Sequence, residues 1–303
     1  MRPELTQAIR LLRSNNPDSV GQAIGLLQNT VYSFSMKVCG HREDAEDTMQ
    51  EVLYRSLRHL ARIEEPRALA VWLYTVTRNR CWRMRRTAAR EAKQLSLDEL
   101  MPDEAEIARL LRHPAPGPES HVLRGEQHDL LRKAVLRIPL QLRIVLVLHD
   151  MEDLGTEEVA QILDLQPGTV RVRLHRARLS VRKEIGRSLN GARQAEKPAK
   201  RRPHKPMRTP PHPPAVCREL FANLSEYLDG RIEPRTCTEM SAHIDSCPSC
   251  LAFLRDLRAA IDRCRSLRLD CAPAVLNRLR ATLTRAYLHL LDEPVEKKMS
   301  TKL

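Results

Sequence analysis

The chain has 303 residues, which at a typical domain size of roughly 150 residues predicts two or three domains rather than one large core. Lysine and arginine total 51 against 38 acidic residues, and the resulting formal charge of +13 makes polyanions the first partners to consider. The low aromatic content of 3% and the scarcity of glycine favour helices over strands. No apolar run reaches the roughly 18 residues of a spanning helix, and we find neither a signal peptide nor a catalytic motif, so we expect a soluble, cytoplasmic protein that is not an enzyme and does not bind membranes.

The first predicted domain, residues 1–93, contains an acidic segment followed by an apolar helix. Residues 42–51 hold five acidic side chains in an otherwise basic chain, and apolar residues recur at helical spacing from Val52 to Leu60. Acidic side chains at the start of a helix stabilise its dipole, so a purely structural role is one interpretation.

A second segment of this domain combines aromatic rings with arginines. Six of the ten aromatic residues fall between Tyr32 and Trp82, and several arginines follow Trp72 and Tyr74. Rings beside cations suit single-stranded nucleic acid, on whose bases they stack. Trp72 and Tyr74 could equally be core residues, which the aromatic content alone favours.

Residues 94–120, which contain four prolines, are predicted to be a linker to a middle domain at 121–190. There, Thr156 can cap a helix over 156–163, residues 164–168 predict a turn, and a second helix starts at Thr169. Its apolar seam is Val170, Leu174, Ala177, Val181 and Ile185, and its other faces are basic. This pattern predicts a helix-turn-helix whose early residues read bases and whose later cations, such as Arg178, meet phosphate. The alternative is an ordinary helical hairpin with a solvated basic face.

A proline-rich basic linker is predicted over 191–216, followed by a cysteine-rich domain over 217–303. The sharpest metal pattern in the chain is a histidine followed by two cysteines, His243-x-x-x-Cys247-x-x-Cys250, which suits Zn²⁺. A closed tetrahedral site needs a fourth ligand, which Cys217, Cys237, Cys264 or Cys271 could supply. We prefer Cys217 on a family resemblance and hold Cys237 in reserve. Free cysteines that act as small buried hydrophobes are the alternative. Oxidation of the thiolates would couple metal loss to unfolding of this domain.

Together, three motifs resemble regions 2 and 4 of an extracytoplasmic-function sigma factor of bacterial RNA polymerase. They span residues 44–52, 72–79 and 158–178, in the order and at the separation of that family. The resemblance implies that one helix docks on the polymerase, through Asp44, Glu46, Asp47, Gln50 and Glu51. It implies that a second segment binds the unwound minus-ten promoter element, through Trp72, Tyr74, Arg78, Asn79 and Arg83. It implies that the later helix reads the minus-thirty-five element, through Thr169, Arg171, Arg173, His175 and Arg176, while Arg178 remains a candidate phosphate contact.

The segment from Cys217 to about residue 262 resembles the zinc-binding domain of anti-sigma factors, in which an upstream His or Cys completes the site. We therefore expect an all-α protein of three small helical domains, in which a sigma factor is fused to a domain that regulates it by packing against the sigma domains. The amphipathic helix after Ala272 could supply that contact or could complete the core of the C-terminal domain. Two rival functions are a metal-responsive DNA-binding regulator that acts without polymerase and an enzyme on nucleic acid with a catalytic zinc.

Overall fold

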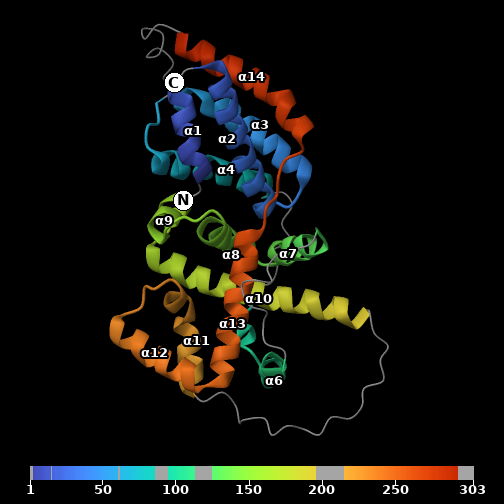
Figure 1. Cartoon of the computed structure of the whole chain (residues 1–303), viewed down its shortest axis with the longest axis vertical. Helices are drawn as coiled ribbons and strands as arrows, with labels where there is room; N and C mark the ends of the chain where they lie inside the picture. The colour runs from blue at the N-terminus through green and yellow to red at the C-terminus, as the bar shows by residue number, and fades with distance from the viewer. Residues whose placement is uncertain are drawn as a thin grey trace. The chain divides into compact units, whose positions relative to one another are not determined.

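The computed structural model describes residues 3–14, 16–60, 62–85, 95–112, 125–195 and 215–292, and every regular element in these ranges is a helix (Figure 1). This confirms the predicted all-α class. The chain divides into two compact units, each built from separate stretches of sequence. Unit 1 contains residues 1–90, 152–165 and 268–303, and unit 2 contains residues 91–151 and 166–267. These boundaries differ from the three predicted domains because burial joins segments that are distant in sequence.

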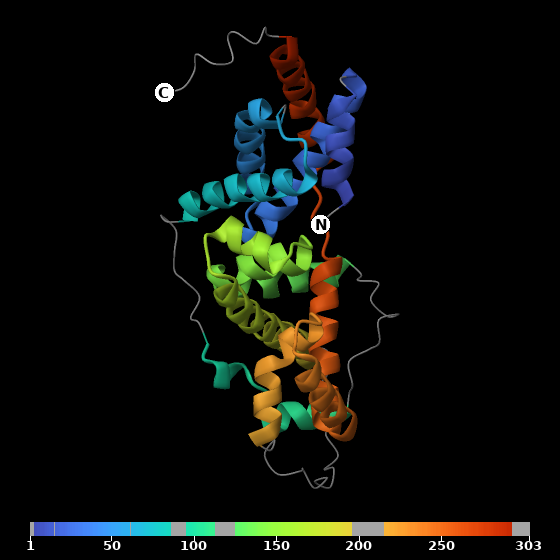
Figure 2. The ribbon, with the colours of Figure 1, turned by 90° about the vertical axis from the view of Figure 1, so that its left-hand side faces the viewer.

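Unit 1 is organised around one central helix, α2. Its helices are α1 (Pro3–Arg13), α2 (Pro17–Val38), α3 (Arg42–Leu60), α4 (Pro66–Arg85), α9 (Thr156–Leu163) and α14 (Pro273–Asp292). Four of these helices pack on α2, namely α1, α3, α4 and α14 (Figure 2). Because α2 is surrounded, even Gln28 and Lys37 are buried. The Lys37 Nζ lies 2.9 Å from Glu152 Oε1, and both side chains are fully buried.

The last helix, α14, packs against α2 and α3 of the predicted first domain. Gln28 Nε2 donates a buried 3.3 Å hydrogen bond to the carbonyl oxygen of Leu276. Gly25 of α2 faces the Arg280 side chain so closely that a Cβ there would lie 3.3 Å from its guanidinium. Of the two alternatives left open by the sequence, the helix after Ala272 therefore contacts the first domain.

Unit 2 is organised around α10. Its elements are α5 (Leu97–Leu100), α6 (Glu104–Arg112), α7 (Gly125–Arg137), α8 (Leu140–Leu146), the π-helical turn η2 (Val147–Met151), α10 (Pro167–Ala195), α11 (Ala215–Leu228), α12 (Pro234–Ser246) and α13 (Pro248–Ser266). Helices α5, α7, α8, α11 and α13 all contact α10. The predicted apolar seam is buried at all five positions from Val170 to Ile185.

The stretch 94–120, predicted to be a linker, is largely helical where the structure describes it. Ser96 and Glu99 form a reciprocal capping box at the start of α5. Leu100, Ile107 and Leu110 are buried in the apolar cluster that also contains residues of α11 and α13. The sequence prediction gave too much weight to prolines that mostly follow α6. Of the second predicted linker, residues 191–195 belong to α10, residues 215–216 belong to α11, and the stretch 196–214 lies outside the described residues.

The two helices predicted at 156–163 and from 169 onward are present, with small corrections at their starts. The N-cap of α9 is Gly155 rather than Thr156, and its N–H donates to the Glu158 carboxylate at 2.7 Å. Asp164 ends α9 in the left-handed conformation with φ of 54°, and α10 starts at Pro167 because proline suits the first turn of a helix. Among the described helices, none combines the length and apolarity needed to span a bilayer.

Candidate metal centre and nucleic-acid interface

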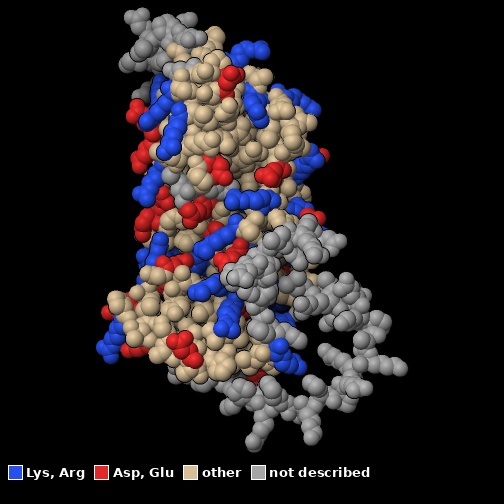
Figure 3. Space-filling model, in the orientation of Figure 1, with Lys and Arg blue, Asp and Glu red and all other residues tan. Residues whose placement is uncertain are grey.

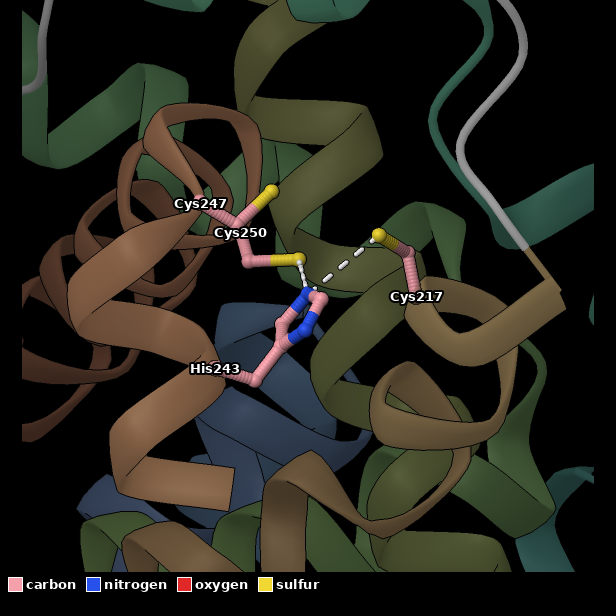
Figure 4. Close-up of side chains that lie close together, drawn as sticks. All are labelled: Cys217, His243, Cys247 and Cys250. Atoms are coloured by element: carbon pink, nitrogen blue, oxygen red, sulfur yellow. Dashed lines mark hydrogen bonds between the residues drawn. The ribbon is translucent and has the colours of Figure 1, made fainter. Parts of the chain in front are cut away.

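Four cysteine and histidine side chains converge where three helices of unit 2 meet (Figure 4). Cys217 comes from the first turn of α11, His243 from the last turn of α12, and Cys247 and Cys250 from the start of α13. Their ligand atoms lie within 4.8 Å of one another. His243 Nε2 is 3.4 Å from Sγ of both Cys217 and Cys250. Tetrahedral zinc with ordinary bond lengths separates a nitrogen and a sulfur ligand by about 3.5 Å, so the donors and spacing fit this ion.

The ends of two helices explain why the cysteines meet. Cys247 ends α12 and serves as N-cap of α13, so Cys250 follows on the first turn of the same helix. Burial acts to raise the pKa of the Cys247 thiol, but hydrogen bonds from the backbone of Cys250 and the neighbouring thiols lower it overall. Burial raises the pKa of Cys217 and Cys250. A metal ion would therefore have to displace protons from these two thiols as it binds.

The reserve ligand is not part of this cluster. Cys237 lies half-buried on α12, and the metal-type cluster found in the described residues contains Cys217 instead. Cys264 and Cys271 are buried outside it. The structure therefore brings together the three side chains selected by their spacing and Cys217, which the resemblance to anti-sigma factors favoured.

Helix α10 presents only part of its predicted DNA-binding set to solvent. Thr169 and Arg171 are exposed, and Arg173 and Arg176 are half-buried. His175 is buried, and its Nδ1 lies 2.9 Å from the Ser225 hydroxyl of α11. Burial, together with the neighbouring arginines, lowers the pKa of His175 to about 4. The imidazole is therefore neutral at pH 7.

Arg178 is fully buried between two carboxylates, which corrects the prediction of a phosphate contact. Its Nε and Nη2 donate to Asp150 at 2.8 and 2.6 Å, and Nη1 and Nη2 donate to Asp229 at 3.0 and 2.8 Å. Nη1 also donates to the Ser225 carbonyl at 3.2 Å, so all five N–H groups are used. Although burial acts to raise it, the pKa of Asp150 is held well below its ordinary value by Arg178.

Arg182, one turn later, is held in the same way. Its Nη1 lies 2.6 Å from Glu106 of α6 and 3.1 Å from Asp256 of α13. Its guanidinium stacks 4.5 Å from the centre of the Phe253 ring. Sequence analysis did not identify Ser225, Asp229 or Asp256 as partners of α10, because no local pattern links them to it. On the face in Figure 3, basic side chains alternate with acidic ones rather than forming one cationic patch.

The predicted polymerase-binding residues lie along α3 in unit 1. Asp47 and Gln50 are exposed and Asp44 is half-buried. Glu46 pairs with Arg42 at 2.7 Å, and Glu51 lies 2.9 Å from Arg55 and 2.6 Å from Arg80. A groove of about 410 Å³ separates this face from α14. It is lined by Asp47, Gln50, Glu51, Tyr54, Arg80, Leu279, Thr282 and Leu283.

The aromatic residues of α4 divide between core and surface. Tyr74 is 1% exposed and donates to Glu152 Oε2 at 2.7 Å, which makes it a core residue rather than a DNA contact. Trp72 is half-buried against the His59 ring at 5.0 Å. Arg78 donates to the Ile162 carbonyl at 2.8 Å. The exposed members of the predicted minus-ten set are therefore Asn79 and Arg83, beside the half-exposed Trp82.

Comparison with known proteins finds matches to three parts of the chain. The family models for sigma-70 region 2 and sigma-70 region 4 match residues 24–91 and 128–181, and a zinc-finger family model matches residues 217–251. The chain is 24% identical over 188 residues to the ECF RNA polymerase sigma factor SigW of Bacillus subtilis, covering 61% of this chain and 98% of that protein. It is 31% identical over 154 residues to the ECF sigma factor SigE of Mycolicibacterium smegmatis, covering 50% of this chain and 56% of that protein.

A solved structure was also found, of the sigma factor RpoE in complex with the anti-sigma factor NepR from Bartonella quintana. It shares 21% identity with this chain, covers 53% of this chain and 92% of that chain, and has a TM-score of 0.39. The sequence matches define a sigma-70-type protein with regions 2 and 4. The chain therefore combines regions 2 and 4, similar to those of the extracytoplasmic-function sigma factors, with a zinc-finger domain on the C-terminal side of region 4, as the motifs indicated.

Proposed function

We propose that the protein directs bacterial RNA polymerase to promoters in the cytoplasm and that its C-terminal part inhibits it in cis. The observation that carries the first half is the presence of regions 2 and 4, in order, in one chain. A regulator that acts without polymerase is not favoured, because it would not need region 2. The relatives cited above are named as sigma factors rather than enzymes.

The polymerase would bind the acidic face of α3. Asp47 takes part in none of the ion pairs found among the described residues, and both Asp47 and the uncharged Gln50 are exposed. Glu46 and Glu51, in contrast, are held in place by arginines. Asp44 would add a further charge at the start of the helix. A negative face in a basic protein suits a positively charged partner surface, because complementary charges speed encounter and fix orientation.

Promoter DNA would bind at two places. At the end of α4, Asn79 and Arg83 can meet unwound bases and backbone, with Trp82 as a stacking ring. At the start of α10, Thr169 and Arg171 are exposed, and Arg173 and Arg176 are partly accessible, which suits readout of the minus-thirty-five element.

The three helices α11, α12 and α13, which we call the zinc-finger segment, would bind one Zn²⁺ through Cys217, His243, Cys247 and Cys250. Four protein ligands leave no open coordination position, so the ion would hold these helices together rather than activate water. This supports a structural role for the metal and argues against a catalytic one.

Inhibition in cis is supported by the position of α14. This helix packs on α2 and α3 and forms one wall of the groove whose other wall carries Asp47, Gln50 and Tyr54. A polymerase surface that contacts these side chains would meet α14 at the same place. Because α14 belongs to the same chain, its effective concentration is in the range of roughly millimolar, so even a weak contact is well populated.

The test is initiation by purified core polymerase from a promoter selected with this protein. The full chain should form a complex and initiate, and truncation after residue 195 should increase initiation several-fold. The truncated chain retains regions 2 and 4. Asp47→Lys with Gln50→Lys should abolish complex formation, whereas Glu43→Lys, exposed at the start of α3, should preserve it. Failure of the full and truncated chains to bind core polymerase would refute the sigma-factor function, and equal initiation by both would refute inhibition.

A further inference from the structure

An apolar side chain is exposed in the second turn of α10, the helix proposed to read the minus-thirty-five element. Val172 is 56% exposed, and the other large apolar side chains exposed in the described part of the chain, Tyr54 and Trp82, both belong to unit 1. A singly exposed apolar residue is common on protein surfaces and indicates nothing by itself. The position of Val172, shortly after the helix starts at Pro167, gives it a meaning.

Val172 points directly away from the buried seam of the helix. Val170 and Leu174 stand two residues before it and two residues after it, and both are buried. Two residues correspond to a rotation of about 200° around a helix, so the side chain between them faces the opposite side. On that side, a Cβ added at Gly168, one turn before Val172, would meet no atom within 4 Å. This face of the helix is therefore open to close approach.

Two arginines flank the valine. Arg171 is exposed and Arg173 is half-buried, and each lies about 100° from Val172 around the helix, one on either side. Thr169, three residues before Val172, is exposed on the same face. Cations on both sides attract the phosphates of a duplex and set the orientation of the helix on it, which places the valine between them and over the bases.

We propose that Val172 selects thymine at one position of the minus-thirty-five element, by contact with the C5-methyl group of the base. The proposal rests on the promoter-binding function proposed above and adds a base preference to it. The N-terminal residues of a recognition helix meet base edges in the major groove, where thymine presents a methyl group. Valine has no side-chain donor or acceptor, so it packs against that methyl group but leaves the polar edges of other bases unsatisfied.

The shape of valine suits this contact. Its branched Cβ leaves one strongly preferred rotamer in a helix, so the two methyl groups are held in place before DNA arrives. A side chain that is already fixed loses little conformational entropy on binding. We expect removal of the thymine methyl group to weaken binding by about fourfold, which is the effect of exposing one methyl-sized group.

The experiment removes the methyl group from the DNA rather than from the protein. The full-length protein, alone and bound to core polymerase, selects its preferred sequence from a pool of randomised duplexes. Each selected thymine is then replaced in turn by deoxyuridine, which lacks only the methyl group, and binding of the fluorescein-labelled duplex is followed by anisotropy. One replacement should weaken binding to the wild-type protein by about fourfold and should leave the affinity of Val172→Ser unchanged. Val172→Ile, which keeps a branched apolar side chain, should respond as the wild-type protein does.

Arg171→Ala is the matched control, because it changes the adjacent exposed side chain. It should weaken binding to every duplex and lower the salt dependence, yet the same replacement should still cost about fourfold. Thymines bound elsewhere on the protein or on the polymerase are recognised because their methyl effects persist in Val172→Ser.

Equal methyl effects in the wild-type protein and Val172→Ser at every thymine would overturn the proposal, as would a selection that enriches no sequence containing thymine. A full-length protein that discriminates the methyl group through Val172 but never binds core polymerase would refute the sigma-factor function and leave the thymine contact standing.

Discussion

Arg178→Met should destabilise unit 2 strongly, although the sequence alone places Arg178 on a DNA-binding helix. Arg178 and Asp150 are both fully buried, so the substitution leaves the Asp150 carboxylate buried with only His149 beside it, at 3.0 Å. Removing one partner of a buried ion pair costs about 3–5 kcal/mol. The matched control, Arg171→Met, changes an exposed arginine on the same helix and should change stability by less than about 0.5 kcal/mol.

Urea denaturation can assign the loss to one unit because of where the tryptophans lie. The only two tryptophans of the chain, Trp72 and Trp82, are both in α4 of unit 1, so their fluorescence reports on that unit, whereas circular dichroism reports on the helices of both. Arg178→Met should therefore shift the circular dichroism transition to lower urea and leave the main fluorescence transition in place.

A double variant tests the physical cause. Arg178→Met with Asp150→Asn should recover much of the lost stability, since a buried ion pair replaced as a pair costs far less than a single unpaired charge. A loss below about 1 kcal/mol in Arg178→Met, or no recovery in the double variant, would show that the buried pair of Arg178 and Asp150 does not stabilise unit 2.

Three further predictions concern other groups. Glu152→Gln removes the carboxylate charge that contacts both the buried Lys37 ammonium and the Tyr74 hydroxyl, and should lower the stability of unit 1 by about 3–5 kcal/mol in the fluorescence transition. An unchanged midpoint would contradict this. The pKa of His175 is about 4 in the folded protein and about 6.5 in an unfolded chain, so between these pH values unfolding takes up a proton and the protein loses stability as the pH is lowered. From pH 7 to pH 5, the wild-type protein should lose about 2 kcal/mol more stability than the His175→Asn variant. Equal losses in the two proteins would show that burial does not lower the pKa of His175. Metal analysis after gel filtration should find one zinc ion in the purified full chain and in the Cys237→Ser variant, and none in the Cys217→Ser variant. The reverse pattern in the two variants would make Cys237 the fourth ligand.

Features that depend on local sequence were predictable. The helical class and the seam from Val170 to Ile185 follow from a periodicity that is visible in the chain itself. The metal cluster was also predictable in large part, because His243, Cys247 and Cys250 lie within eight residues and their spacing across one helix junction fixes their geometry.

Features that depend on distant partners were not predictable. Arg178 looks like a surface cation because its two acids lie 28 residues before it and 51 residues after it. Tyr74 is committed to the core by Glu152, which is 78 residues away. Periodicity identifies a buried face but does not identify what covers it, so the burial of charged side chains escaped the sequence analysis.

The packing of α14 on α2 joins two helices that are synthesised at different times. The hydrogen bond from Gln28 to Leu276 joins residues 248 positions apart, so α2 is synthesised long before the helix that covers it. At translation rates of roughly 5–20 residues per second, the stretch from residue 195 to the C-terminus takes about 5–20 s to emerge. Each newly made molecule therefore passes through an interval in which regions 2 and 4 exist without α14, the helix that we propose to be inhibitory, and a ribosome paused in that stretch would prolong it.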